Sequence, residues 1–178
     1  MAKYRVICAG SRDFEDKEYV YKVLDHYLKN LPKNDTELFD GEARGPDTIG
    51  GAYALEKGYG RRPFPAKWDE LGKGAGFIRN EEMAKHGTHL IAFWDGKSRG
   101  TKDMIDRALK HRLRVVIIRL QRIDQTEEAR ENVYEITQRR GPAFPGSKEP
   151  ERGDQVSRGP GGENISGIAE HLDCQKAA

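Results

Sequence analysis

The sequence predicts an α/β fold: a Rossmann-like parallel sheet of about five strands flanked by helices. Short apolar runs, such as residues 4–9 and 89–94, are typical of buried parallel strands. Segments with helical spacing separate these runs, and strands that alternate with helices form right-handed βαβ units. Glycine-rich turns follow several of the strands, where glycine lets backbone N–H groups approach an anion. The three observations together predict a sheet with a ligand-binding edge.

The predicted elements follow in order along the first 120 residues. Two prolines at residues 61–66 predict an edge strand there, because proline cannot donate to a sheet ladder. The helix at residues 75–86 is expected to direct Ile78 and Met83 toward the core. Strands are expected at residues 4–9, 37–40, 61–66, 89–94 and 114–120. Helices are expected at residues 17–31, 47–57, 75–86 and 101–112, the last with an inner stripe of Met104, Ile105, Ala108 and Leu109.

The chain divides by composition into three parts. Residues 1–120 are expected to form one domain, identified below as a candidate for binding nucleotide ligands, and residues 121–140 are expected to add a helix near 126–139, with Ala129, Val133 and Ile136 on one side. Residues 141–178 are rich in glycine, proline and charge, which predicts a flexible tail.

Charge and cysteine content limit the classes of protein. Charged residues make up 34% of the chain and hydrophobic ones 36%, with no apolar run of about 18 residues that would span a membrane. Cys8 and Cys174 form no CxxC pair, which fits a reducing, cytoplasmic setting. Residues 1–120 carry 23 basic and 18 acidic side chains, against 8 and 11 in residues 121–178. A modestly basic body suits anionic ligands but is too weak to argue for duplex DNA.

Two loops after the first strands are candidates for phosphate contacts. Gly10, Ser11, Arg12 and Asp13 follow the first strand, where backbone N–H groups, the Ser11 hydroxyl and Arg12 would meet an anion. The alternative is an ordinary turn in which Asp13 bonds its own backbone. The second loop runs from Gly41 through Glu42, Ala43, Arg44, Gly45 and Pro46 to Asp47, and its glycines also allow close approach of a ligand.

The stretch from residue 72 to residue 101 holds the remaining candidates. Arg79 would clamp a phosphate, and Asn80 beside it both donates and accepts; the alternative is a surface pair of Arg79 with Glu81 or Glu82. Asp95 lies at the carboxyl end of a strand, where an aspartate commonly contacts a ribose or acts as a general base. The alternative is a solvated aspartate in a turn. The candidate anion-binding site at the start of the next helix consists of Ser98, Gly100 and Thr101.

Aromatic and histidine residues complete the inventory. Trp68, expected in a loop, and Trp94, in a strand, are candidates for stacking on a base, with core packing as the alternative. The five histidines do not cluster with cysteines or carboxylates at ligand spacing, so the sequence predicts no metal site and no cofactor.

Six motifs of the sequence resemble those of a known family. GSRDF, GEARGPD, PAKW, GKGAGFIRN, IAFWDG and SRGT, in this order, are similar to the YspA-like branch of the SLOG superfamily, which also holds the LOG phosphoribohydrolases and the Rossmann domain of DprA. The resemblance covers about residues 4–119. It implies a Rossmann-like domain, often a homo-oligomer, that binds nucleotides or nucleotide-derived ligands.

The resemblance also bears on catalysis. LOG enzymes cleave the N-glycosidic bond of nucleoside monophosphates with an arginine, a Gly-Gly-x-Gly-Thr loop and an essential glutamate. Arg79 matches that arginine, and Gly100 and Thr101 match the end of the loop. Met104 occupies the glutamate position, and methionine is neither an acid nor a base. The candidate catalytic carboxylates are therefore Asp103 and Asp95.

Three hypotheses follow. In the first, the chain senses or sequesters a nucleotide-derived signal, ADP-ribose-like, in a bacterial or phage setting. The second is hydrolysis of a nucleoside monophosphate, and the third is binding of single-stranded nucleic acid. In the first hypothesis Gly10, Ser11, Arg12, Gly45, Arg79, Gly100 and Thr101 contact the anion, and Trp68, Asn80 and Asp95 read the sugar or base.

Overall fold

A computed structural model describes residues 1–120 and the backbone of residues 132–137. Six strands form one sheet in the order β3-β2-β1-β4-β5-β6. The first five in sequence pair in parallel, which confirms the predicted Rossmann-like sheet, and β6 pairs antiparallel to β5. The strands are β1 (Tyr4–Gly10), β2 (Thr36–Asp40), β3 (Gly60–Pro63), β4 (His89–Trp94), β5 (Arg114–Arg119) and β6 (Asn132–Thr137).

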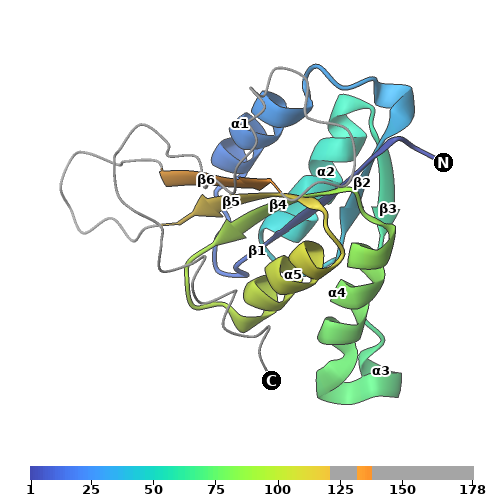
Figure 1. Ribbon diagram of the computed structural model, residues 1–178, viewed down its shortest axis with the longest axis vertical. Helices are drawn as coiled ribbons and strands as arrows, with labels where there is room; N and C mark the ends of the chain where they lie inside the picture. Colours follow the sequence, from blue (N-terminus) through green and yellow to red (C-terminus); the bar gives the residue numbers. More distant parts are fainter. Residues whose placement is uncertain (121–131, 138–178) are drawn as a thin grey trace.

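Helices cover both faces of this sheet. Figure 1 shows α1 and α2 on one face and α4 and α5 on the other, with α3 at the far end of α4. None of the helices in the described ranges is long and apolar enough to cross a bilayer. The helices are α1 (Lys17–Leu28), α2 (Pro46–Lys57), α3 (Trp68–Leu71), α4 (Ala75–His86) and α5 (Arg99–Lys110), with short 3-10 turns at Lys33–Asp35 and Gly72–Gly74.

Alternation along the strands divides the core between the two faces. In β1, Val6 and Cys8 join the cluster under α1 and α2, whereas Ile7 and Ala9 join the cluster under α4 and α5. Successive side chains of a strand point to opposite faces, so a strand that is apolar throughout is buried on both sides. The predicted inner stripe of α5 is buried in the second cluster, as expected.

The chain end differs from the prediction. The sequence favours a helix at residues 126–139, but residues 132–137 form the strand β6, paired with β5 from Arg114 opposite Thr137 to Arg119 opposite Asn132. The segment NVYEIT is rich in β-branched and aromatic residues, and pairing supplies partners for the backbone groups along the edge of β5. The rest of that predicted helix and the tail at residues 141–178 lie outside the described residues.

Two smaller expectations near α4 were also wrong. Met83 is fully buried as predicted, but Ile78 is exposed, because the first turns of α4 extend beyond the sheet together with α3 (Figure 1). Trp68 begins α3 and does not lie in an irregular loop. The edge position of β3 agrees with the prediction drawn from its prolines.

Close contact between α2 and β1 depends on a glycine. A Cβ placed on Gly50 would lie 2.6 Å from both Cβ and Sγ of Cys8. By contrast, a Cβ on Gly100, in the first turn of α5, would meet no atom within 4 Å. A side chain therefore has no room at Gly50 but has room at Gly100, although both glycines lie in helices.

We predict that Gly50→Ala destabilises the fold by about 1–3 kcal/mol, because the added methyl group overpacks the α2–β1 contact. The matched control Gly100→Ala is expected to be neutral or to stabilise by up to about 1 kcal/mol, the difference in helix propensity. Denaturant unfolding followed by circular dichroism measures both changes. An equal loss in both variants would contradict the packing argument.

Candidate functional site

The carboxyl ends of β1 and β4 lie where the chain connections diverge. β1 leads into α1 on one face of the sheet, and β4 leads into α5 on the other (Figure 1). Such a point in an open parallel sheet leaves a crevice in which ligands bind. Here the crevice contains a cavity of about 540 Å³, within the size range of small-molecule sites.

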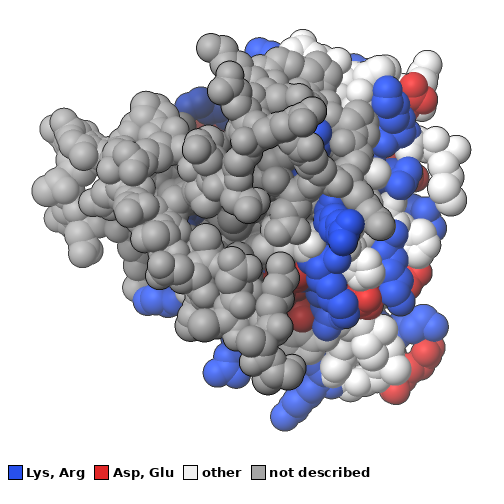
Figure 2. Space-filling view, viewed as in Figure 1, with Lys and Arg blue, Asp and Glu red and all other residues white. Residues whose placement is uncertain are grey.

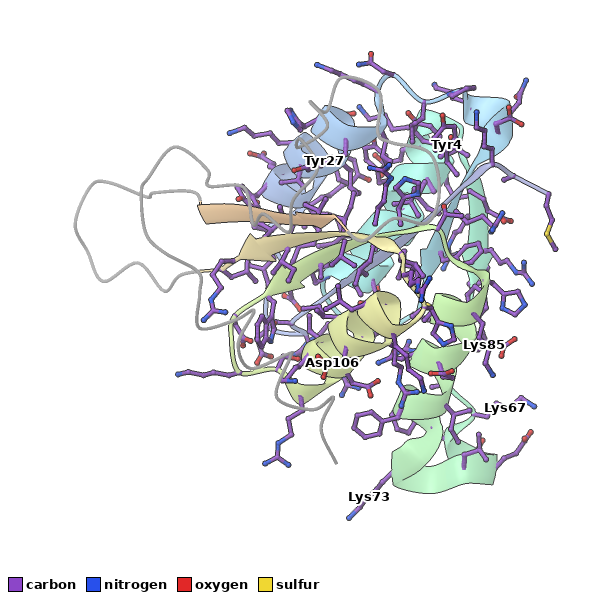
Figure 3. All side chains as sticks on the ribbon, viewed as in Figure 1. Tyr4, Tyr27, Lys67, Lys73, Lys85 and Asp106 are labelled. Atoms are coloured by element: carbon purple, nitrogen blue, oxygen red, sulfur yellow. The ribbon has the colours of Figure 1, made fainter. Side chains whose placement is uncertain are left out.

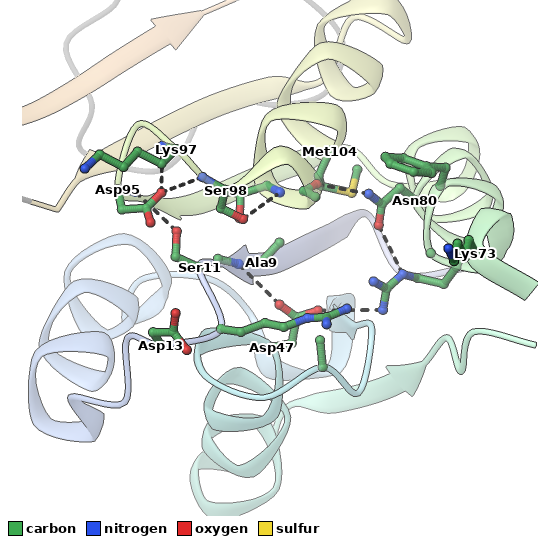
Figure 4. A pocket seen from close by; sticks show the side chains of 18 of the residues that line it. Ala9, Ser11, Asp13, Asp47, Lys73, Asn80, Asp95, Lys97, Ser98 and Met104 are labelled. Atoms are coloured by element: carbon green, nitrogen blue, oxygen red, sulfur yellow. Dashed lines mark hydrogen bonds and ion pairs between the residues drawn. The ribbon is translucent and has the colours of Figure 1, made fainter. Parts of the chain in front are cut away.

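Most residues that the sequence analysis named line this cavity. They come from the loop after β1, the N-terminus of α2, the α3–α4 segment and the loop between β4 and α5. Figure 4 shows Ser11, Asp95 and Ser98 together at one end and Asn80 and Lys73 at the other. The named residues in the lining are Gly10, Ser11, Arg12, Asp13, Asp47, Trp68, Arg79, Asn80, Asp95, Ser98, Gly100 and Thr101.

A buried carboxylate, Asp47, joins the ends of two strands. Its Oδ1 accepts the backbone N–H of Gly10 and its Oδ2 accepts that of Gly41, each at 3.2 Å. Its Oδ2 also lies 3.8 Å from a guanidinium nitrogen of Arg79. Burial raises the pKa of Asp47 to about 6, although Arg79 and the two N–H groups act in the opposite direction. Asp47 thus holds the first two loops and Arg79 in one arrangement.

Two guanidinium groups face the cavity. Arg79 donates to the carbonyl of Gly41 and to the side-chain oxygen of Asn80, which fixes its orientation. Burial lowers the pKa of Arg79, Asp47 opposes this shift, and the positive charge of Arg12 adds to it. The side chain of Arg12 makes no ion pair within the described part of the chain. An anion between the two guanidinium groups would relieve their mutual repulsion.

The backbone of the first loop is less available than the sequence suggested. The N–H of Gly10 is bound by Asp47, and that of Ser11 donates to the carbonyl of Phe93 at 2.9 Å. The hydroxyl of Ser11 accepts from the N–H of Asp95 at 3.2 Å. The loop therefore offers Arg12 to an anion, while its first N–H groups maintain the loop itself.

Asp95 shapes the loop after β4. Its Oδ1 accepts the N–H groups of Lys97 and Ser98 at 2.9 and 2.8 Å. Burial opposes ionisation of Asp95, but these backbone hydrogen bonds outweigh it and hold the pKa below its ordinary value. A carboxylate with a low pKa and two bound N–H groups is a poor general base at neutral pH.

The start of α5 is open toward the cavity. Ser98 caps the helix by accepting from the N–H of Thr101 at 3.4 Å, and the two hydroxyls lie 2.9 Å apart. The N–H groups at the first positions of a helix have no intrahelical acceptor, and the helix dipole adds positive potential there. The space around Gly100 leaves this end accessible to a ligand.

Asp103 does not line the cavity. Its carboxylate accepts from Asn80 Nδ2 at 2.9 Å and from Arg107 Nε at 2.8 Å, and Arg107 in turn pairs with Glu81 at 2.5 Å. Asn80 links this network to Arg79. Asp103 is therefore placed to position Asn80 and Arg79, and the expected role of a catalytic carboxylate finds no support in its contacts.

Only part of the second loop, Ala43 and Asp47, lines the cavity itself. Gly41 and Arg44 line an adjoining hollow that shares Arg12 and Arg79 with it. Arg44 pairs with Asp13 at 2.5 Å on the surface. Gly45 has a φ of 86°, and a Cβ there would lie 2.9 Å from the carbonyl oxygen of Phe14, so this glycine lets two loops pack together. Gly45 therefore has a structural role in the packing of these loops.

Several lining residues were not predicted. Phe77, Lys73 and Lys97 line the cavity, together with the buried Met104. Phe77 lies two residues before Arg79, and residues two apart do not share a helix face, so helical spacing does not indicate it. The projection of α3–α4 brings it to the cavity. Trp94 does not line it: the Arg119 guanidinium lies 5.0 Å from the centre of its ring. Within the described residues no group of three or more His, Cys, Asp or Glu is placed to hold a metal ion.

Comparisons with known proteins agree with this architecture. A family model described as the YspA, cpYpsA-related SLOG family matches residues 4–70. Gene 61 protein of Mycobacterium phage D29 is 33% identical over 118 residues, which cover 63% of this chain and 94% of that protein. The chain belongs to the YspA, cpYpsA-related SLOG family. SLOG membership confirms the resemblance and supports a function related to nucleotides or nucleic acids in general.

A solved structure shares the SLOG fold. DNA processing protein A (DprA) from Streptococcus pneumoniae aligns with a TM-score of 0.54 at 19% identity. The match covers 69% of this chain and 52% of DprA, so the chain spans about half the length of that protein. At this identity the likeness concerns the fold, and it confirms the Rossmann-like prediction.

The raised pKa of Asp47 predicts a pH dependence of stability. Because the pKa rises from an ordinary 3.8 to about 6 on folding, protonated Asp47 stabilises the folded state. This contribution is complete below about pH 4 and is lost as the pH rises through about 6. A rise of the pKa from 3.8 to about 6 corresponds to roughly 3 kcal/mol.

Urea unfolding of the wild type and of Asp47→Asn, between pH 4 and pH 7.5, measures this contribution. The asparagine side chain of this variant does not titrate. The difference in unfolding free energy between the two chains should therefore change with pH. Parallel curves for the two chains would mean that Asp47 is not the responsible group.

Proposed function

We propose that the protein binds a nucleotide-derived signalling ligand, ADP-ribose-like, by its phosphates in the cavity beyond β1 and β4, as a sensor or sequestering protein. The observation that carries the proposal is the pair of guanidinium groups, Arg12 and Arg79, which face one cavity at the switch point of the sheet. Arg79 is held in place by Gly41 and Asn80, so little ordering is needed on binding.

The start of α5 supports the same proposal from the other wall. Its free N–H groups and dipole favour a phosphate, and Gly100 leaves room for close approach. A phosphate between Arg12 and this helix end would meet positive potential from two directions. Family membership is consistent with such a ligand.

The charge pattern on the described part of the face in Figure 2 does not favour a duplex nucleic acid. On the described part of the face in Figure 2, Lys and Arg side chains are interspersed with acidic and uncharged ones. Duplex DNA binding normally uses a concentrated basic face. A small anionic ligand needs only the local cations of the cavity.

Hydrolysis of an N-glycosidic bond is the second candidate, and one observation favours it. Asp47 is a buried carboxylate in the cavity wall with a pKa of about 6, which is suitable for proton transfer near neutral pH. Incubation with AMP followed by mass spectrometry of the denatured mixture tests this candidate. Release of free adenine that is absent in Asp47→Asn would establish it, and recovery of intact AMP favours binding alone.

We predict that Arg12→Gln weakens binding of ADP-ribose roughly ten- to hundred-fold, because a charge-assisted hydrogen bond to a phosphate is lost. Arg12 is exposed, so the fold should be unaffected. Lys110→Gln is the matched control, since it removes an exposed charge at the opposite end of α5. Isothermal titration calorimetry with AMP, NAD and ADP-ribose measures the affinities. Equal affinity of wild type and Arg12→Gln for every compound that binds would exclude this phosphate site.

Gly100→Ala is expected to separate stability from binding. The added Cβ meets no protein atom within 4 Å, yet it stands where a phosphate would approach the start of α5. We expect unchanged or higher thermal stability together with about tenfold weaker binding of the same compounds. The same calorimetric titration measures the effect, and unaltered affinity would place the phosphate away from α5.

A further inference from the structure

Exposed apolar side chains gather on one segment of the molecule. Six large hydrophobic residues are exposed within the described ranges, and four of them fall between residues 68 and 78. This segment, comprising α3, the turn after it and the first turns of α4, projects beyond the sheet (Figure 1). Lys67 and Lys73 extend outward from it (Figure 3). The four residues and their exposed fractions are Trp68, 50%; Leu71, 41%; Phe77, 43%; and Ile78, 53%.

Only the two aromatic members of this group line the cavity. Trp68 and Phe77 are part of its wall, together with Arg79, whereas Leu71 and Ile78 are not. Trp68 also lines the adjoining hollow, where it again accompanies Arg12 and Arg79. Exposed aromatic side chains at the border of a cavity usually mark a binding surface, because the monomer gains nothing from leaving them in water.

The indole of Trp68 lies beside a glycine of α4. A Cβ on Gly76 would lie 3.4 Å from Cη2 of the indole, so the edge of the ring lies close to the backbone of α4. The Trp68 side chain is nevertheless half exposed. A ring supported at its edge and open to solvent provides a flat apolar surface beside the two guanidinium groups.

We infer that Trp68 and Phe77 form a base-binding subsite, so that the ligand carries a planar nitrogenous base at α3–α4 and a phosphate at Arg12 and Arg79. This inference rests on the proposed function. It identifies the part of the ligand that Arg12 and Arg79 would not contact. Stacking is tolerant of base identity, because every base has an aromatic face. The subsite therefore distinguishes nucleotides from sugar phosphates and discriminates weakly between adenine and guanine.

Tryptophan fluorescence tests the inference directly. The chain has two tryptophans, and Trp94 lies outside the cavity, so in Trp94→Phe the emission comes from Trp68 alone. Titration of this variant with AMP is expected to quench the emission with saturation. Ribose 5-phosphate, which lacks the base, is expected to bind at least roughly tenfold more weakly and without quenching.

Substitution of the two aromatic residues tests whether they bind the base. Trp68→Ala and Phe77→Ala should weaken AMP binding in calorimetry by roughly ten- to hundred-fold while leaving the affinity for ribose 5-phosphate unchanged. Ile78→Ala is the matched control, because Ile78 is an exposed neighbour on the same projection but does not line the cavity. It should leave both affinities unchanged.

The outcomes separate this inference from the proposed function. If AMP and ribose 5-phosphate bind equally well, and Trp68→Ala changes neither affinity, the base subsite is wrong while the phosphate site stands. If neither compound binds, nor NAD nor ADP-ribose, the phosphate site and the subsite both fail. If Trp68 emission without ligand shifts with protein concentration, a second copy of the chain covers the ring, and the inference is overturned.

Discussion

The buried carboxylate of Asp47 is the interaction on which the arrangement of the site depends. It joins the N–H groups that end β1 and begin the loop after β2, and it stands beside the guanidinium of Arg79 from α4. Its place in the first turn of α2 adds the favourable helix dipole. Without the carboxyl group at this point, Arg79 would lose the largest favourable charge acting on it, and the two strand ends would lose their common acceptor.

Much of the fold could be predicted because the information is local. The strand His89–Trp94 is apolar after its first residue and bounded by turns, so its length and burial follow from the sequence. Convergence of the glycine-rich loops then follows from parallel pairing alone. The strand β6 was mispredicted because Val133 and Ile136 recur at helical spacing, whereas pairing with the open edge of β5 favours a strand.

The roles of individual site residues were harder to predict, because they depend on contacts between distant segments. Asp103 was a reasonable catalytic candidate from its position, yet its contacts with Asn80 and Arg107 tie it between two helices. Phe77 gave no signal, since a phenylalanine in a helix normally predicts core. Its exposure results from the projection of α3 and α4 beyond the sheet, which no local pattern encodes.

The polar contacts of the cavity favour binding over bond cleavage. The three carboxylates in its lining already have partners: Asp13 pairs with Arg44, and Asp47 and Asp95 accept backbone N–H groups. Both oxygens of Asp47 are engaged in this way, and the lowered pKa of Asp95 makes it a poor general base at neutral pH. The groups that remain for a ligand are cations, a helix end and aromatic faces, and under the proposed function these would hold a phosphorylated base without activating it. The raised pKa of Asp47 is then a consequence of its structural burial, and it would serve catalysis only if a ligand displaced one of its N–H partners.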